Sequence, residues 1–159
     1  MENLLDLTPK DTKLVKDRER VRKIIHEKSG ITRNDLEKIS KLSKYNLEKI
    51  LNNLEGAKEI RIESIFGKYR IIEDDTNEQD TIIKIALSIP AYKKMIRFLL
   101  VHPQEQLDEL SEQIQKTRST TFNHLERLTE EGIIKKSFID RKLFYSLKNS
   151  KKILKLLEK

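Results

Sequence analysis

Residues 107–147 have the sequence LDELSEQIQKTRSTTFNHLERLTEEGIIKKSFIDRKLFYSL. At its start, apolar residues recur at spacings of three and four, which predicts a short helix with one buried face. These residues are Leu107, Leu110 and Ile114. Thr117 is of a residue type that caps helix N-termini, so a second helix is expected to follow it. The buried face of that second helix carries Thr121, Leu125 and Leu128.

A β-hairpin is expected after the second helix. Glu131–Gly132 ends the helix, and the tract SFIDRKLFYSL that follows is rich in β-branched and aromatic residues. Its middle, Asp140-Arg141-Lys142, is the predicted tip of the hairpin. Two helices joined by a tight turn and followed by a hairpin form a winged helix-turn-helix. Because a DNA major groove admits one α-helix, residues 117–130 are predicted to be the principal recognition helix.

The same pattern occurs a second time, about 74 residues upstream. Pairs of similar residues keep this separation, among them Leu36/Leu110, Leu51/Leu125, Leu54/Leu128 and Ile60/Ile134. A repeat this long indicates a duplicated domain, because solenoid units span about 20 to 50 residues. We therefore expect a mainly α fold with small β-hairpin wings, built as tandem winged helix-turn-helix domains. The predicted boundaries are 1–72 for the first domain, 73–80 for an acidic linker and 81–159 for the second domain.

The first copy contains the same signals in the same order. Thr8–Pro9 starts a helix that runs to about Lys28, with an apolar stripe of Leu14, Val21, Ile24 and Ile25. Thr32 and Ser43 cap two further helices, and IRIESIFGKYRII is the hairpin, with Gly-Lys at its middle. The second copy has additional helices at both ends. Ile82, Ile83, Ala86 and Leu87 predict a leading helix, and Ile153, Leu154, Leu156 and Leu157 a C-terminal one.

The charges of the chain are unevenly placed. The formal net charge is +7 and the pI about 9.5. Residues 73–80, EDDTNEQD, contain five acids and no base, so two basic segments flank an acidic one. A basic body attracts polyanions, of which nucleic acid is the usual one. The alternative interpretation is the solvated surface of a heat-adapted protein, in which Lys and Glu are enriched.

Several classes of function lack a sequence signal. The chain has no cysteine, and His26, His102 and His124 have no ligand-like spacing, so no metal site is expected. No Gly-rich phosphate loop is present, and we expect no enzyme activity, no catalytic residue and no cofactor. The N-terminal residues MENLLDLTPKD lack the pattern of a signal peptide, and no run of about 18 apolar residues exists. The expectation is a cytoplasmic protein without a membrane partner.

The second copy resembles the winged-helix core of ArsR-type and related MarR-type transcription regulators over roughly residues 80–148. The matching residues are Leu110, Thr117, His124–Leu125, Leu128, Glu131–Gly132–Ile133 and Phe144–Tyr145–Ser146. The first copy resembles the same template more loosely over about residues 17–72. The resemblance implies a DNA-binding transcription regulator, and two cysteine-free copies look most like an archaeal one. The sequence departs from the family at Phe122, at Lys116, and at Lys58, which replaces the glycine before the wing.

Eight residues of the second copy are predicted to contact DNA. The open side of the helix at residues 117–130 combines phosphate donors with groups that recognise base edges. The N-terminus of this helix offers free amides to a phosphate. These residues are Thr117, Arg118, Ser119, Thr120, Asn123 and Arg127. Arg141 and Lys142 at the wing tip are expected to contact phosphates or a minor groove. For both groups the alternative is an ordinary solvated surface.

The corresponding residues of the first copy form a weaker candidate. They are Lys44, Tyr45, Asn46 and Lys49 on its third helix and Lys68 and Arg70 in its wing. Glu48 lies among them and would repel phosphate, so the first copy is expected to bind DNA more weakly or to contact protein. Phe66 is expected to be an exposed apolar group at the wing tip.

Some alternatives stay open at this point. His124 either packs the helix-turn-helix or contacts a phosphate, and Phe122 either contacts a thymine methyl or packs against a partner. The C-terminal helix either pairs two chains into a homodimer or folds back on its own domain. Two functions are weighed: a regulator that binds double-stranded DNA, or a winged-helix protein-interaction module within a transcription-initiation or replication complex.

Overall fold

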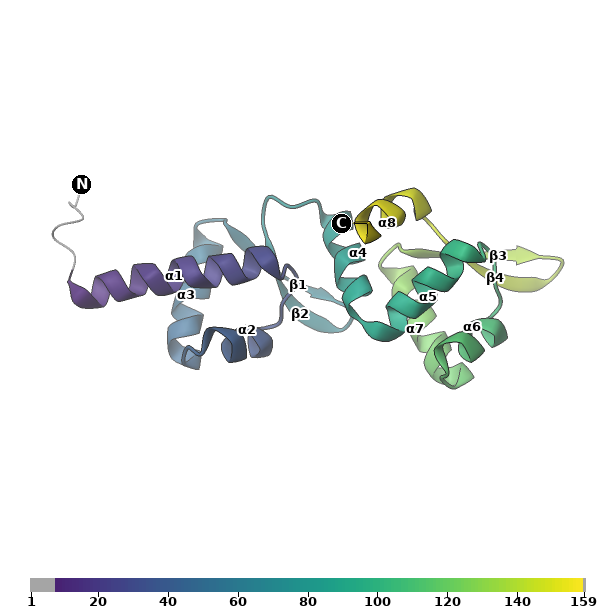
Figure 1. The fold of residues 1–159 in the computed structure, drawn as a ribbon, viewed down its shortest axis with the longest axis horizontal. Helices are drawn as coiled ribbons and strands as arrows, with labels where there is room; N and C mark the ends of the chain where they lie inside the picture. The colour runs from purple at the N-terminus through teal and green to yellow at the C-terminus, as the bar shows by residue number, and fades with distance from the viewer. Residues whose placement is uncertain (1–7, 159) are drawn as a thin grey trace. The chain divides into compact units, whose positions relative to one another are not determined.

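The computed structural model describes residues 8–158 and divides the chain into two compact units, Met1–Thr76 and Asn77–Lys159. Figure 1 shows the order of the elements. The first unit contains α1 (Pro9–Glu27), α2 (Arg33–Ser40), α3 (Lys44–Gly56), β1 (Ile60–Ile65) and β2 (Lys68–Glu73). No helix within residues 8–158 combines the length and the apolar character that crossing a membrane requires.

The second unit contains two more helices than the first. Its elements are α4 (Glu78–Ser88), α5 (Pro90–Val101), α6 (Leu107–Ile114), α7 (Arg118–Glu130), β3 (Ile134–Ile139), β4 (Lys142–Leu147) and α8 (Ser150–Leu157). In each unit, the two strands form an antiparallel hairpin directly after a helix-turn-helix. Each unit is therefore a winged helix-turn-helix, and the fold class predicted from the sequence, mainly α with β-hairpin wings, is confirmed.

Helix starts coincide with the predicted capping residues. The Thr8 hydroxyl accepts a hydrogen bond from the Asp11 N–H, and the Asp11 carboxylate accepts one from the Thr8 N–H, which completes a capping box. The side chains of Ser43 and Thr117 likewise accept from backbone N–H groups in the first turns of α3 and α7. These bonds satisfy donors that have no partner inside a helix.

The elements of the two units have matching bounds. The starts and ends of α2, α3, β1 and β2 each precede those of α6, α7, β3 and β4 by 74 residues. An isolated antiparallel bridge joins the chain just before α2 or α6 to the second wing strand of the same unit, as Ile31–Ile71 and as Glu105–Tyr145. Backbone conformation also matches: Lys58 has φ 59°, and Gly132, 74 residues later, has φ 77°.

Each unit has an apolar core under the second helix of its helix-turn-helix, which is α3 in the first unit and α7 in the second. In the first unit the core includes Val21, Ile25, Leu36, Leu47, Ile50, Leu51, Leu54 and Ile71. In the second unit the buried side chains include Met95, Leu99, Leu110, Leu125, Leu128, Tyr145 and Ile153. Leu14 was predicted to belong to the apolar stripe of α1, but its side chain is exposed. The N-terminal part of α1 extends past the elements on which the rest of that helix packs (Figure 1).

The hairpin tips differ in detail from the prediction. The turns are Phe66–Gly67 and Asp140–Arg141, all four residues have positive φ, and this is the backbone of a type I′ turn. Lys68 and Lys142 are therefore the first residues of β2 and β4 rather than turn residues. The expectation that Phe66 is exposed is wrong, since its side chain is 5% exposed.

The acidic stretch 73–80 is shared between elements. Glu73 is the last residue of β2, and Glu78 is the first residue of α4. The Asn77 side chain accepts a hydrogen bond from the Asp80 N–H and so caps α4. Acidic residues in the first turn of a helix also interact favourably with its macrodipole. The connecting segment between the two elements is thus limited to residues 74–77.

The C-terminal helix packs within its own unit. Ile153 is fully buried, α8 contacts α4, and Lys152 Nζ lies 2.8 Å from Asp80 Oδ1. The sequence left two roles open for this helix, pairing of two chains or folding back on its own domain, and in the structure the helix folds back on its own domain. Leu154 on the same helix is exposed.

Two glycines provide a matched test of the backbone. A Cβ added at Gly56 or at Gly132 would meet no atom within 4 Å, but only Gly132 has a positive φ, of 77°. We predict that Gly132→Ala lowers the free energy of unfolding by about 1 kcal/mol, because L-residues are strained in the left-handed region. Gly56→Ala should instead raise it by about 0.5–1 kcal/mol, since alanine restricts the unfolded chain.

Urea unfolding of the two variants measures both changes. Equal effects of the two substitutions would contradict this account, because the space available to the methyl group is the same at both positions.

Candidate nucleic-acid interface

The α7 helix presents a polar face to solvent. Thr121, Leu125 and Leu128 are buried, and this fixes the rotation of the helix about its axis. The predicted contact residues Thr117, Arg118, Ser119, Asn123 and Arg127 are exposed, and Thr120 is half-buried. The Thr117 hydroxyl accepts from the Thr120 N–H at 3.1 Å, so the cap holds the first turn of the helix. The predicted residues of α7 therefore lie together on one helix and its N-cap.

Arg118 is held by an acid of the preceding helix. Its Nε lies 2.8 Å from Asp108 Oδ1, and both side chains are exposed. Gln115, between the two helices, is in the left-handed conformation with φ 56°, which makes the tight turn that brings them together. The sequence analysis did not identify the pairing of Asp108 with Arg118. An exposed ion pair contributes little net energy, so a phosphate is able to replace the carboxylate.

His124 packs beneath the polar face. Its ring is half-buried and contacts the Tyr92 ring of α5 edge-on, with 5.2 Å between the centroids. Burial lowers the pKa of His124 below its usual value, and Arg127 and Lys116 lower it further. Of the two roles left open for His124, this geometry corresponds to packing of the helix-turn-helix.

The second wing is anchored to α7 at its base. Lys136 of β3 forms an ion pair with Glu126 of α7, and the hydrogen bond to Glu126 raises the pKa of Lys136. Tyr145 of β4 is buried, and this burial raises the pKa of its phenol. Arg141 and Lys142 are exposed at the other end of the hairpin. The wing therefore joins a fixed base to a cationic tip.

Phe138 is a feature of this wing that sequence reasoning missed. Its side chain is 76% exposed although it lies in a strand. Leu143 is its cross-strand partner, so the two side chains share one face of the hairpin. Strand alternation places Phe138 on the same face of the hairpin as Tyr145, which is buried. The sequence does not show where the core beneath this face ends, and so it could not predict that Phe138 is exposed.

The third helix of the first unit has a mixed surface. The predicted residues Lys44, Tyr45, Asn46 and Lys49 are all exposed. Lys49 Nζ lies 5.4 Å from the centroid of the Tyr45 ring, a cation–π distance. Glu48 Oε1 lies 2.8 Å from Arg33 Nε of α2, so the acid expected to repel phosphate is paired within its own unit.

Lys68 and Arg70 differ in their environments. Lys68 is exposed at the start of β2. Arg70 is half-buried, and its guanidinium donates from Nε to the Ile65 carbonyl and from Nη1 to the Gly30 carbonyl, both at 3.1 Å. Arg70 therefore ties its wing to the loop after α1. Its guanidinium is bonded to backbone carbonyls and is not exposed beside Lys68.

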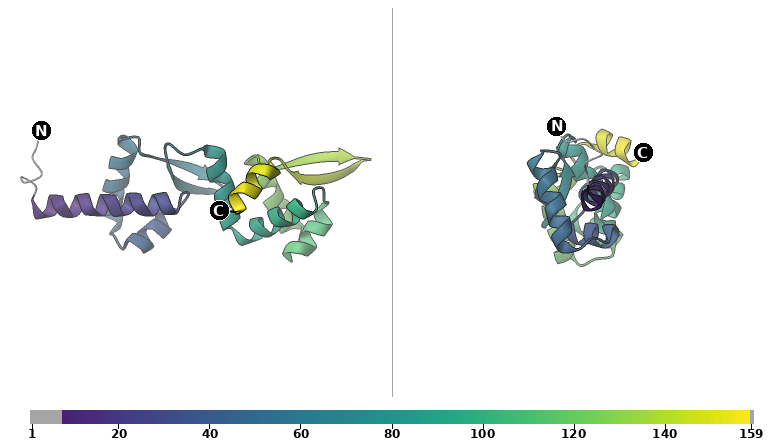
Figure 2. Two further views of the ribbon diagram at one scale, coloured as in Figure 1. Left: turned by 45° about the horizontal axis from the view of Figure 1, so that its top comes forward. Right: turned by 90° about the vertical axis from the view of Figure 1, so that its left-hand side faces the viewer.

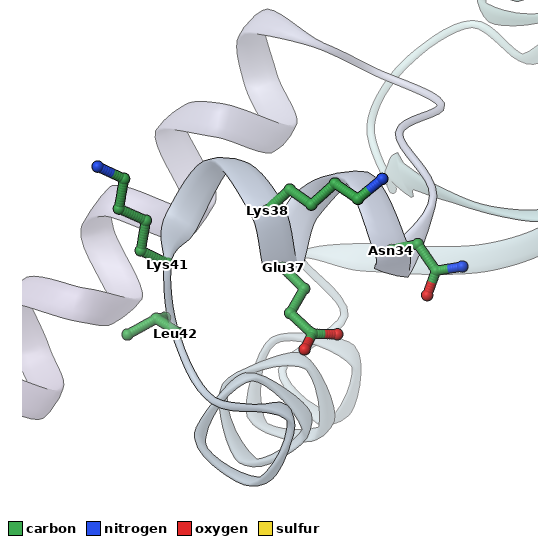
Figure 3. A pocket seen from close by; sticks show the side chains of 5 residues that line it. All are labelled: Asn34, Glu37, Lys38, Lys41 and Leu42. Atoms are coloured by element: carbon green, nitrogen blue, oxygen red, sulfur yellow. The ribbon is translucent and has the colours of Figure 1, made fainter.

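A shallow depression lies on the first unit at α2 and the turn that follows it. Its walls are Asn34, Glu37, Lys38, Lys41 and Leu42. Figure 3 shows that the polar side chains point in different directions rather than toward one point. Small-molecule sites have convergent polar groups, which this depression lacks. Among residues 8–158, no group of three or more His, Cys, Asp or Glu is arranged to hold a metal ion.

Comparison with known proteins gives two solved structures of interest. HlyU from Vibrio cholerae is 18% identical with a TM-score of 0.45, over 53% of this chain and 91% of that one. The transcriptional repressor BigR from Xylella fastidiosa is 19% identical with a TM-score of 0.42, over 74% of this chain and 92% of that one. No family model and no curated protein sequence matches the chain. At TM-scores below 0.5, the two similarities do not establish what this chain does.

The lowered pKa of His124 predicts a pH-dependent stability. The unfolded chain binds a proton at this histidine near its ordinary pKa of about 6.5, whereas the folded chain binds it only at lower pH. The free energy of unfolding should therefore fall as the pH drops below about 6.5. In His124→Gln this fall should be smaller. Urea unfolding of both proteins at pH 7.5 and pH 5 measures the difference, and an identical fall in both would contradict the prediction.

Proposed function

We propose that the chain is a DNA-binding transcription regulator in which α7 is the principal recognition helix. The observation that carries the proposal is the exposed surface of α7, where Asn123 and Arg127 lie opposite the packed apolar face and Arg118 is exposed in the first turn. Arginine and asparagine are side chains that contact phosphates and base edges in a major groove. The cationic tip of the β3–β4 wing supports the proposal, because it adds phosphate contacts beside the same helix.

We further propose that the two units are tandem copies of one domain, with residues 73–80 at their junction. The equal offset of element bounds, bridges and left-handed residues supports a duplication. In the first unit, Lys44, Lys49 and Lys68 are exposed cations suited to phosphate. With Glu48 and Arg33 paired, the first unit adds positive charge to the binding without a comparable set of base-reading groups.

The alternative function is a protein-interaction module within a transcription-initiation or replication complex. The observation that favours it is a pair of exposed tyrosines in the first unit, Tyr45 on α3 and Tyr69 on β2. Exposed aromatic residues are enriched in protein interfaces. A homodimer is a related proposal, for which the exposed Leu154 of α8 offers an apolar contact.

Measurement of DNA affinity against salt concentration tests the regulator proposal. Wild-type protein should bind duplex DNA, and log K should fall linearly with log salt, with a slope of about 0.9 per phosphate contacted. The double variant Arg118→Ala/Asn123→Ala should bind at least tenfold more weakly and should lose any preference between sequences, because base contacts contribute about 1–3 kcal/mol each.

The matched control is Lys155→Ala, an exposed cation on α8 far along the chain from the proposed contacts. It removes one positive charge but no proposed contact, so affinity should change little. Absence of DNA binding at low salt, or equal losses in the control and the double variant, would contradict the proposal and favour the protein-interaction module.

The Arg118–Asp108 pair generates a second prediction. Asp108→Asn removes an acid next to the proposed phosphate site and releases Arg118, so DNA affinity should rise roughly threefold to tenfold at low salt. Glu109→Gln is the control, because it removes a charge from the same helix and Glu109 forms no ion pair within residues 8–158. Its gain should be smaller. No gain with Asp108→Asn in an affinity titration would show that Arg118 is not at the DNA contact.

A further inference from the structure

The second wing ends in an apolar tip. Phe138 is 76% exposed, and Ile139 beside it is also exposed. Figure 2 shows the β3–β4 hairpin projecting beyond the helices of its own unit. Exposing a large aromatic ring to water is unfavourable. Burial of this ring against a partner would therefore be favourable.

The hairpin register separates this tip from the base of the wing. Phe138 faces Leu143, and Lys136 faces Tyr145 two pairs nearer the base on the same side of the hairpin. Tyr145 is buried in the core, and Lys136 is paired with Glu126 of α7. The base of the wing is thus fixed to the proposed recognition helix, and Phe138 lies two residue pairs farther out on the same face.

Two cations lie at the apolar tip. Arg141 and Lys142 are exposed, and neither forms an ion pair with another residue in the described part of the chain. Asp140 in the turn is the single acid of the hairpin. The matching partner is therefore strongly anionic at its rim and apolar within. Duplex DNA has this arrangement, with phosphates along the edges of a groove and stacked bases between them.

We propose that Phe138 is a wedge that inserts between base pairs of duplex DNA from the minor groove and kinks the duplex. This inference rests on the proposed function, because it requires α7 to dock in the neighbouring major groove. Arg141 and Lys142 hold the phosphates at the groove edges, and the Phe138 ring enters a base step. Apolar side chains inserted in this way unstack the step and bend DNA by about 20–90°.

The first wing carries its exposed ring on the opposite strand. Ser64 holds the register position in β1 that Phe138 holds in β3, 74 residues later, and its cross-strand partner Tyr69 is 70% exposed. A tyrosine ring ends in a polar hydroxyl, whereas the side chains that wedge into base steps are apolar. The bend is therefore assigned to the second unit alone, and Tyr69 provides a matched control for the loss of an exposed aromatic ring.

The bend is measurable by energy transfer between dyes at the two ends of a 30-base-pair duplex. Wild-type protein should bring the ends closer and increase the fluorescence of a 2-aminopurine placed at the unstacked step. Phe138→Ala should abolish both signals and weaken binding on the order of tenfold, in line with the loss of one base–aromatic contact. The slope of log K against log salt should not change, because no charge is removed. Tyr69→Ala should retain the bend.

The outcomes separate this inference from the proposed function. Binding and bending by Phe138→Ala equal to those of wild type would overturn the wedge and leave the regulator proposal intact. Failure of wild type to bind any duplex would overturn both. Loss in Phe138→Ala of self-association or of binding to anionic phospholipid vesicles, with the DNA bend unchanged, would assign the tip to a second copy or to a lipid surface and would also overturn the wedge. Circular dichroism confirms folding of the variant, which is expected at so exposed a position.

Discussion

The burial of one face of α7 determines what the second unit can do. Leu125 and Leu128 are fully buried, as is Thr121 one turn earlier. Removing a buried leucine typically costs about 2–5 kcal/mol, so the helix cannot rotate about its axis without losing much of the stability of the unit. With the apolar face fixed, Asn123 and Arg127 must lie on the outside, while Arg118 is exposed because it begins the helix. The Lys136–Glu126 pair then fixes the wing to the same helix, so that one packing arrangement positions both candidate contact surfaces.

The electrostatics of these surfaces are adjustable. Arg118 and Arg33 are each paired with an exposed acid, Asp108 and Glu48, within their own units. Exposed pairs of this kind contribute about 0–1 kcal/mol, so they hold the cations in place without preventing exchange for a stronger anion. Arg70 is different, because its two bonds to backbone carbonyls hold a wing in place. Arginine thus has two roles in this chain: exposed arginines are available to a ligand, and the half-buried Arg70 stabilises the fold.

Much of the fold is predictable from the sequence, but less of the site is. Caps at Thr8, Ser43 and Thr117 and the spacing of leucines depend on neighbouring residues only, and the helices were predicted from them. The hairpins were predicted from tracts of β-branched and aromatic residues, which are equally local. The pairing of Arg118 with Asp108 and the burial of Phe66 depend on how elements meet in space, and sequence periodicity carries no information on that. The same limit applies to Phe138, since alternation along a strand does not show where the core beneath it ends.

The most direct test of the central claim is a map of DNA contacts by nuclear magnetic resonance. Isotope-labelled protein would be titrated with a short duplex at low salt, and shifts of backbone and side-chain amide signals followed. The account predicts that the largest shifts fall on the exposed side of α7, including the Asn123 side-chain amide, and on the tip of the β3–β4 wing. Shifts confined to α4 and α8, or no shifts at all, would contradict it.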